Sequence, residues 1–130
     1  MTEEKAIGSK LIDSSVIVAY LMDGYHKEII EEEGTLLIST LTLFEIKRKL
    51  GEKNIPEKII NEKIEFIQKR TVSFPVNDEI SLRAAKISVN YKVPAMDSLI
   101  YATALINNSH LITLDNDFRG LTNVTILGDN

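Results

Sequence analysis

Five acidic side chains are placed so that they could bind a metal ion together. Asp13, Asp97 and Asp115 stand at the ends of predicted helices or strands, Glu45 lies within a predicted helix, and Asp117 follows Asp115 closely. Carboxylates are the hard oxygen ligands that Mg²⁺ and Mn²⁺ prefer. The chain has no cysteine, and neither of its two histidines has a partner at metal-ligand spacing. The set predicts a Mg²⁺ or Mn²⁺ site that could activate and orient a water molecule.

Asp97 lies in the first turn of a helix predicted over residues 96–106. Pro94 favours a helix that begins just after it, and the segment is apolar nearly all round, so we expect it to be buried on more than one side. Asp97 is aligned with Ile100 and Ala104 on this helix. Burying an unpaired charge is costly, so the carboxylate needs a cation or strong donors. The alternative is an Asp that only stabilises the helix end.

Each of the other acids also has an ordinary structural interpretation. Asp13 precedes a helix, where Asp is a common N-cap. Asp115 and Asp117 could form a tight turn. Glu45 lies away from the apolar stripe of its helix and could be a solvated surface residue. On the residues alone, these alternatives stay open.

A dense basic cluster at 47–49, with Lys53, is usually a solvated face. Arg48 and Lys49 follow Glu45 by three and four residues, so they share its side of the helix and could contact phosphates beside a metal. The net charge of −4 argues at first against a nucleic-acid partner. If the five acids surround a metal, however, the rest of the chain is nearly neutral, which is compatible with a polyanionic substrate.

Short apolar strands alternate with helical patterns along the chain. We predict strands over 10–12, 36–38, 71–74, 111–114 and 124–127, and helices over 16–22, 26–33, 40–50, 56–69, 78–91 and 96–106. Gly51 is expected to end the third helix, and the fourth is expected to bury Ile59, Ile60, Ile64 and Ile67. This alternation indicates a parallel sheet with helices on both faces, a three-layer α/β/α sandwich. Ligands bind such sheets beyond the carboxyl ends of the strands, where four of the acids could meet.

The length of 130 residues suits a single domain over 1–130, with a loose tail over 1–9. There is no apolar run of about 18 residues and no signal-peptide core, so we expect a cytoplasmic protein without a membrane partner. Glycine-rich phosphate loops and serine-hydrolase motifs are absent from the sequence. A phosphoacceptor receiver domain is disfavoured because strand three leads into Phe74-Pro75-Val76-Asn77, where that class needs an Asp.

Four ordered segments resemble the PIN-domain family, especially the small VapC-type toxins. They are Leu11-Ile12-Asp13-Ser14-Ser15, Leu43-Phe44-Glu45-Ile46, the stretch from Pro94 to Ala104, and the stretch from Leu111 to Phe118. No single segment is specific, but their order and spacing cover nearly the whole chain. The tail before the first strand is longer than is usual in the family.

The resemblance implies a five-stranded parallel sheet in the order 3-2-1-4-5. It implies Mg²⁺ or Mn²⁺ held by Asp13, Glu45, Asp97 and Asp115, with Asp117 at a position that is acidic in many members. It further implies cleavage of an RNA substrate to 5′-phosphate and 3′-hydroxyl ends, and often a homodimer inhibited by a small antitoxin. Ser14, Ser15 and Thr113 could orient the carboxylates or water. The alternatives are an RNA-processing nuclease without an antitoxin, and a non-catalytic PIN-like module that binds RNA or protein.

Overall fold

Five parallel strands form one sheet in the order β3-β2-β1-β4-β5 in the computed structural model, which describes residues 9–128. In the central strand, Leu11 is paired with Leu37 on one side and with Leu111 on the other. The strands are β1 (Lys10–Ile12), β2 (Leu36–Ser39), β3 (Thr71–Phe74), β4 (His110–Thr113) and β5 (Val124–Ile126). The predicted α/β fold and strand order are confirmed.

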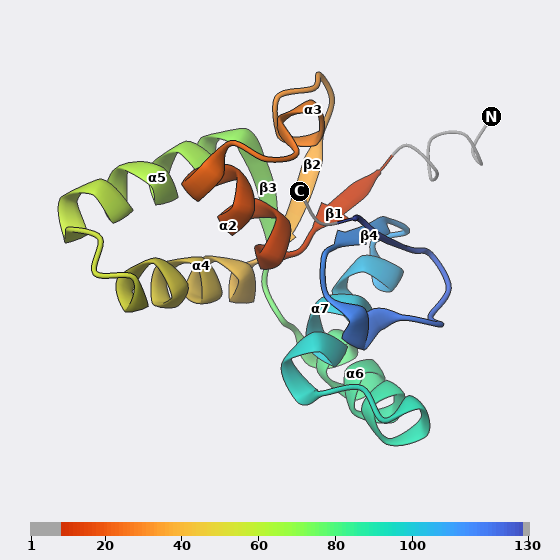
Figure 1. Cartoon of the computed structure of the whole chain (residues 1–130). Helices are drawn as coiled ribbons and strands as arrows, with labels where there is room; N and C mark the ends of the chain where they lie inside the picture. Colours follow the sequence, from red (N-terminus) through yellow and green to blue (C-terminus); the bar gives the residue numbers. More distant parts are fainter. Residues whose placement is uncertain (1–8, 129–130) are drawn as a thin grey trace.

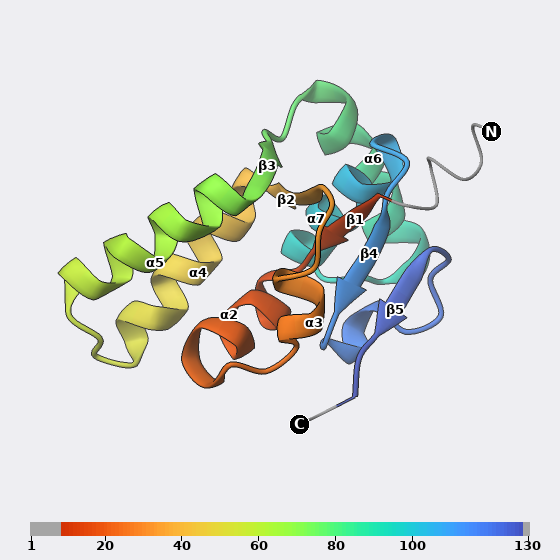
Figure 2. The ribbon, with the colours of Figure 1, turned by 90° about the horizontal axis from the view of Figure 1, so that it is seen from above.

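Helices cover both faces of this sheet, as Figures 1 and 2 show. One face carries α2 (Ser14–Asp23), α3 (Lys27–Ile30), α4 (Thr40–Glu52) and α5 (Glu57–Arg70). The other carries α6 (Asp78–Tyr91) and α7 (Ala95–Ile106), and a short 3-10 helix, η1 (Asn116–Phe118), follows β4. In Figure 1, α4 and α5 extend from the sheet as an antiparallel pair.

The strands are apolar at consecutive positions because both faces of the sheet are buried. Leu11 and Leu111 face the core under α6 and α7, whereas Ile12 and Ile112 face the core under α2, α4 and α5. All four side chains are 6% exposed or less. Side chains alternate across a strand, so β1 and β4 each contribute to both cores.

Three details of the predicted elements are wrong. The helix predicted over 26–33 ends at Ile30, because Arg70 donates hydrogen bonds to the carbonyl oxygens of Ile30, Glu32 and Gly34 and holds that segment in bends. Gly51 lies inside α4, which continues to Glu52. Ile59 is exposed, whereas Ile60 and Ile67 are buried, since only part of the expected stripe of α5 faces the core.

The N-terminal end of the described chain bears on the predicted tail. Residues 1–8 of the predicted tail lie outside the described residues, but the carbonyl oxygen of Ser9 accepts a hydrogen bond from the His110 backbone N–H at 2.9 Å. Ser9 is therefore attached to the sheet.

Within residues 9–128, no helix has the length and apolarity needed to cross a lipid bilayer.

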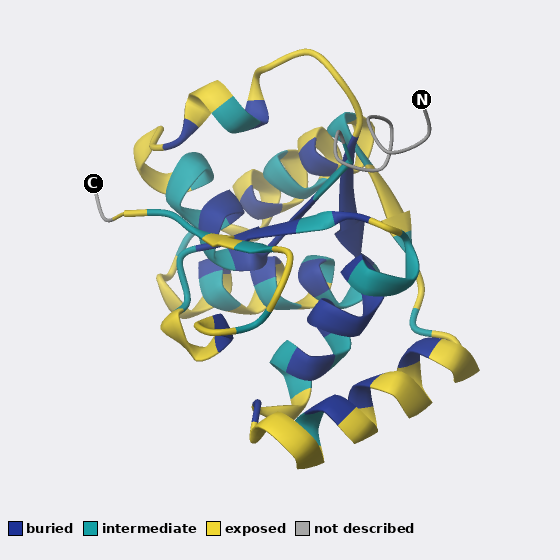
Figure 3. Ribbon diagram, turned by 90° about the vertical axis from the view of Figure 1, so that its right-hand side faces the viewer, coloured by how far each residue is buried: buried dark blue, intermediate teal, exposed yellow. Residues whose placement is uncertain are grey.

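Helix α7 is buried on several sides, as predicted, because α6 and the sheet enclose it. The most exposed large apolar side chains lie instead on α6, whose Leu82, Val89 and Tyr91 are 74%, 76% and 66% exposed. Figure 3 shows the outer side of this helix, at the bottom of the view, as largely exposed. In this half of the protein, α6 therefore carries exposed apolar side chains while α7 is enclosed.

Candidate metal centre

Asp13 joins the end of β1 to the start of α2 and is 5% exposed. Its backbone N–H donates to the carbonyl oxygen of Ile112 at 2.9 Å, which ties it to β4. Its Oδ2 accepts hydrogen bonds from Ser15 Oγ at 2.7 Å and Thr113 Oγ1 at 2.8 Å. The side chain makes no capping bond to α2, so the N-cap alternative does not describe this carboxylate. No donor within residues 9–128 bonds to Oδ1, which leaves that oxygen available to a cation.

Thr113 connects Asp13 to the acids that follow β4. While its hydroxyl donates to Asp13, it accepts a hydrogen bond from the Asp115 backbone N–H at 2.9 Å. Oδ1 of Asp115 in turn accepts from the Asp117 backbone N–H at 2.8 Å. One carboxylate oxygen of Asp115 therefore takes part in a tight turn, as the alternative interpretation of this residue expects. In the part of the chain that the structure describes, its other oxygen accepts no hydrogen bond.

Glu45 is anchored in the same way from α4. Its Oε1 accepts a hydrogen bond at 3.0 Å from the hydroxyl of Ser14, which is 1% exposed at the start of α2. The starts of α2 and α4 lie side by side in Figure 1, and the two helices contact each other. Glu45 is half-buried and not fully solvated. Oε2 accepts no hydrogen bond from residues 9–128, so Glu45, Asp13 and Asp115 each keep one oxygen fixed and one free.

Carboxylate oxygens of Asp97, Asp115 and Asp117 all lie within 4.8 Å of one another. In an octahedral shell with metal–oxygen distances of about 2.1 Å, opposite ligands are about 4.2 Å apart and adjacent ones about 3 Å apart. The three carboxylates therefore need only small side-chain movements to bind one ion. Hard oxygen donors without nitrogen or sulfur suit Mg²⁺ or Mn²⁺ better than zinc.

The electrostatic surroundings of Asp97 link all five acids. Burial, and after it the negative charges of the other four acids, together raise the pKa of Asp97 from 3.8 to about 7. Those acids are, in decreasing order of effect, Asp115, Asp13, Asp117 and Glu45. The residues are distant in sequence but lie within electrostatic range of one carboxylate. A divalent cation would relieve this repulsion, because it replaces the proton as the positive charge.

The raised pKa of Asp97 predicts that the metal-free protein loses stability as the pH rises. The folded state keeps a proton on Asp97 up to about pH 7, whereas the unfolded chain releases it near pH 4. The contribution of Asp97 to the stability of the fold is therefore highest below about pH 4, and it falls progressively as the pH rises from about 4 to about 7. Because the side chain is only partly buried, solvent screening reduces the effect to about 1–2 kcal/mol.

Urea unfolding in a chelator at about pH 5 and about pH 8 measures this effect. The Asp97→Asn variant, which cannot titrate at this position, should lose less stability between the two pH values than the unmodified protein. Identical losses in the two proteins would contradict the assignment of the raised pKa to Asp97.

Arg48 and Lys49, which the sequence places on the same side of the helix as Glu45, have different partners in the structure. Lys49 Nζ donates to Ser14 Oγ at 3.0 Å and so lies on the Glu45 side of α4. Arg48 pairs with Glu52 at 2.9 Å and lines a cavity between α4 and α5 with Phe44. Lys49 therefore contacts the hydroxyl that binds Glu45, whereas Arg48 contacts Glu52 and the cavity between α4 and α5.

Sequence reasoning did not single out Thr42, which precedes Glu45 by three residues on α4. Thr42 is fully buried, and its Oγ1 has no hydrogen-bond partner among residues 9–128. A buried hydroxyl without a partner is uncommon. The three-residue spacing from Glu45 is the signal that could have drawn attention to it.

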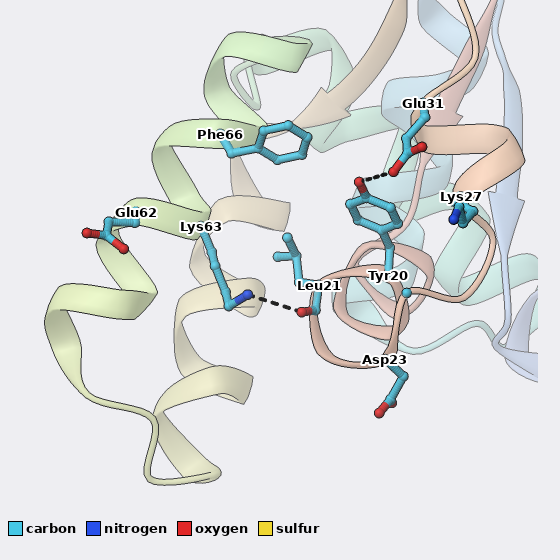
Figure 4. Close-up of a pocket in the computed structure, with 9 residues that line it drawn as sticks. Tyr20, Leu21, Asp23, Lys27, Glu31, Glu62, Lys63 and Phe66 are labelled. Carbon is cyan, nitrogen blue, oxygen red and sulfur yellow. Dashed lines mark hydrogen bonds between the residues drawn. The ribbon is translucent and has the colours of Figure 1, made fainter.

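A separate cavity of about 690 Å³ lies between α2, α3 and α5 and contains none of the five acids. Figure 4 shows Tyr20 donating a hydrogen bond to Glu31 there, at 2.6 Å, and Lys63 donating to the Leu21 carbonyl oxygen at 3.2 Å. The ring of Tyr20 stacks with that of Phe66, with centroids 6.2 Å apart. The charged residues that line it carry both signs, so they do not form a basic patch.

Solved structures with the same fold include bacterial toxin–antitoxin complexes. A toxin–antitoxin complex from Klebsiella pneumoniae aligns with a TM-score of 0.74 at 22% identity, covering 89% of this chain and 95% of the other. DNA-bound VapBC from Salmonella typhimurium aligns at 0.76 and 14% identity, covering 92% and 96%. The toxin VapC20 from Mycobacterium tuberculosis, described as cleaving the sarcin–ricin loop, aligns at 0.71 and 13% identity, covering 87% and 95%.

Comparison of the sequence with protein families adds a direct match. Residues 10–123 match the PIN domain, a span that contains all five acids. No curated protein matches the sequence.

Proposed function

Because the chain belongs to the PIN domain family, we propose that it is a metal-dependent endoribonuclease and the toxin of a toxin–antitoxin pair. The observation that carries this proposal is the arrangement of the acids. Asp97, Asp115 and Asp117 converge within 4.8 Å, and the charges of Asp13 and Glu45 reach Asp97. Convergence of acids from distant parts of the chain is costly for folding unless a cation offsets their charge, so it favours a functional site over a structural one.

Mg²⁺ or Mn²⁺ would be held by Asp13, Asp97 and Asp115, with Glu45 and Asp117 as further ligands or as residues that position water. When bound, the ion supplies a more acidic water molecule and offsets negative charge on the scissile phosphate. The protein side chains hold this arrangement in place. Hydroxyl donors fix one oxygen each of Asp13 and Glu45, so the free oxygens keep their direction without rearrangement during the reaction.

Two alternatives remain distinct from this proposal. An RNA-processing nuclease would use the same acids without an antitoxin, and a non-catalytic module would not need them. The complete set of five acids favours catalysis over the second alternative. Relatives of the same fold in toxin–antitoxin complexes favour the toxin over the first.

The direct test is incubation of the purified protein with RNA in Mn²⁺, in Mg²⁺ and in chelator. We expect cleavage only with a divalent ion, and products with 5′-phosphate and 3′-hydroxyl ends, which enzymatic end-labelling distinguishes. Absence of metal-dependent cleavage across a pool of cellular RNAs, in a folded sample, would reject the ribonuclease proposal.

We also propose a homodimer and a small antitoxin as partners. The outer side of α6, where Leu82 and Val89 are exposed on one stripe, would pack against a second copy, since clustered exposed apolar side chains are typical of interfaces. An antitoxin would place a cationic side chain against the acids, where pairing with carboxylates is strong.

Light scattering is expected to give a dimer mass for the unmodified protein. The double replacement of Leu82 and Val89 by Ser should give a monomer with unchanged circular dichroism. A monomer at micromolar concentration in the unmodified protein would contradict the dimer. Co-expression with a small protein encoded beside it tests the antitoxin, which should co-purify and reduce cleavage.

A further inference from the structure

Lys49 is attached to the acid site through a buried hydroxyl. It follows Glu45 by four residues on α4, so both side chains lie on one side of the helix. Nζ of Lys49 donates to Ser14 Oγ at 3.0 Å, and the same hydroxyl donates to Glu45 Oε1 at 3.0 Å. Ser14 thus fixes the positions of an ammonium group and a carboxylate next to each other.

Lys49 differs from the other two cations of the 47–49 cluster in its partners. Lys47 pairs with Glu57 at 3.8 Å, and Arg48 pairs with Glu52 at 2.9 Å. Lys49 forms no salt bridge with any residue in the 9–128 range; its hydrogen-bond partner there is the neutral hydroxyl of Ser14. An ammonium group has three N–H donors, so two remain for an external acceptor.

The site itself creates a need for such a cation. An RNA backbone approaching five carboxylates meets strong repulsion, and a bound divalent ion offsets part of it. A half-buried ammonium beside Glu45 adds a positive charge in a region where solvent screens less than at the open surface. Lysine acts as a point-charge ligand for phosphate oxygens.

We propose that Lys49, held by Ser14, binds a non-bridging oxygen of an RNA backbone phosphate beside the acid cluster. This inference rests on the proposed ribonuclease function and assigns the substrate contact on the α4 side of the site to one residue. The competing interpretation is that Lys49 only orients Ser14 and Glu45. The two differ in what they predict for RNA affinity and for metal binding.

The first measurement is the affinity of a short fluorescein-labelled oligoribonucleotide, by anisotropy, over a series of KCl concentrations. The Asp97→Asn background is used so that the RNA stays intact. Lys49→Ala should weaken binding about tenfold and reduce the slope of log Kd against log[KCl] by about 0.7, the value for one phosphate contact on a single strand. Lys49→Arg should retain most of the affinity.

Lys47→Ala is the matched control, since it removes the same charge from the same helix. It should change affinity less than about twofold, because Lys47 pairs with Glu57 on the surface. If Lys49→Ala and Lys47→Ala have equal effects, or if Lys49→Arg binds as weakly as Lys49→Ala, the specific phosphate contact is overturned.

The second measurement separates substrate binding from support of Glu45. With Asp97 intact, Lys49→Ala should raise KM more than it lowers kcat, and its melting temperature should rise with Mn²⁺ as much as that of the unmodified protein. Loss of the Mn²⁺ response would overturn the inference in favour of a role through Glu45. If the unmodified protein cleaves RNA but Lys49→Ala leaves the affinity and the salt slope unchanged, the inference about Lys49 is overturned and the proposed function stands. Unmodified protein that neither binds nor cleaves RNA rejects the proposed function.

Discussion

Replacing Asp97 with Asn is expected to lower the rate of RNA cleavage by at least about 10²-fold while the fold is kept. Asn has the shape of Asp but carries no charge, so the site loses a carboxylate that lies within 4.8 Å of Asp115 and Asp117. The neutral side chain also removes the buried charge and the repulsion that together raise the pKa of Asp97, so the metal-free variant should be at least as stable as the unmodified protein. Cleavage rates in Mn²⁺ and urea unfolding in chelator measure the two expectations.

Asp78→Asn is the control for this experiment. Asp78 occupies the first turn of α6 as Asp97 occupies the first turn of α7, but it is exposed. The same substitution there should leave the cleavage rate unchanged. If Asp97→Asn cleaves as fast as Asp78→Asn, the acid cluster is not the catalytic site.

Divalent metal is expected to stabilise the folded protein, and Asp13→Asn is expected to remove most of that stabilisation. An ion that binds only the folded state at about 100 times its Kd adds about 2.7 kcal/mol, which for a chain of this size raises the melting temperature by about 5–10 °C. Asn at position 13 can still accept hydrogen bonds from Ser15 and Thr113, but it lacks the charge that attracts the ion. The variant should therefore fold and respond weakly.

Thermal unfolding with Mg²⁺, with Mn²⁺ and with chelator gives the comparison, and Asp78→Asn again serves as the control that should respond fully. A second test uses Asp23→Asn, which changes an exposed acid at the far end of α2. Equal metal responses in Asp13→Asn and both controls would mean that the acids do not form one binding site.

The sequence by itself determined the fold class and the candidate acids. Consecutive apolar residues such as Leu11 and Ile12 require burial on both faces of a strand, which specifies a layered sheet. Asp13 and Asp115 follow strands and Asp97 begins a helix, and parallel strands bring such positions to one edge. These are local properties, because periodicity and end signals depend on neighbours along the chain.

Only the tertiary structure decided whether the carboxylate of Asp13 caps its helix. Asp13 looks like an N-cap in sequence, but its carboxylate bonds to Thr113, a residue far along the chain. That contact exists because β1 pairs with β4, and no local pattern encodes which strands pair. The strand order itself followed from resemblance to a family and not from periodicity.

Tertiary structure also decided the roles of neighbouring residues on one helix. Arg48 and Lys49 are equivalent by spacing from Glu45, yet one pairs with Glu52 and the other with Ser14. Likewise, the sequence shows that α7 is apolar nearly all round, but only the structure shows that α6 covers it and itself carries exposed apolar residues. The physical reason is the same in both cases. A sequence specifies what a side chain can bind, whereas the packing of distant elements decides which partner lies within reach.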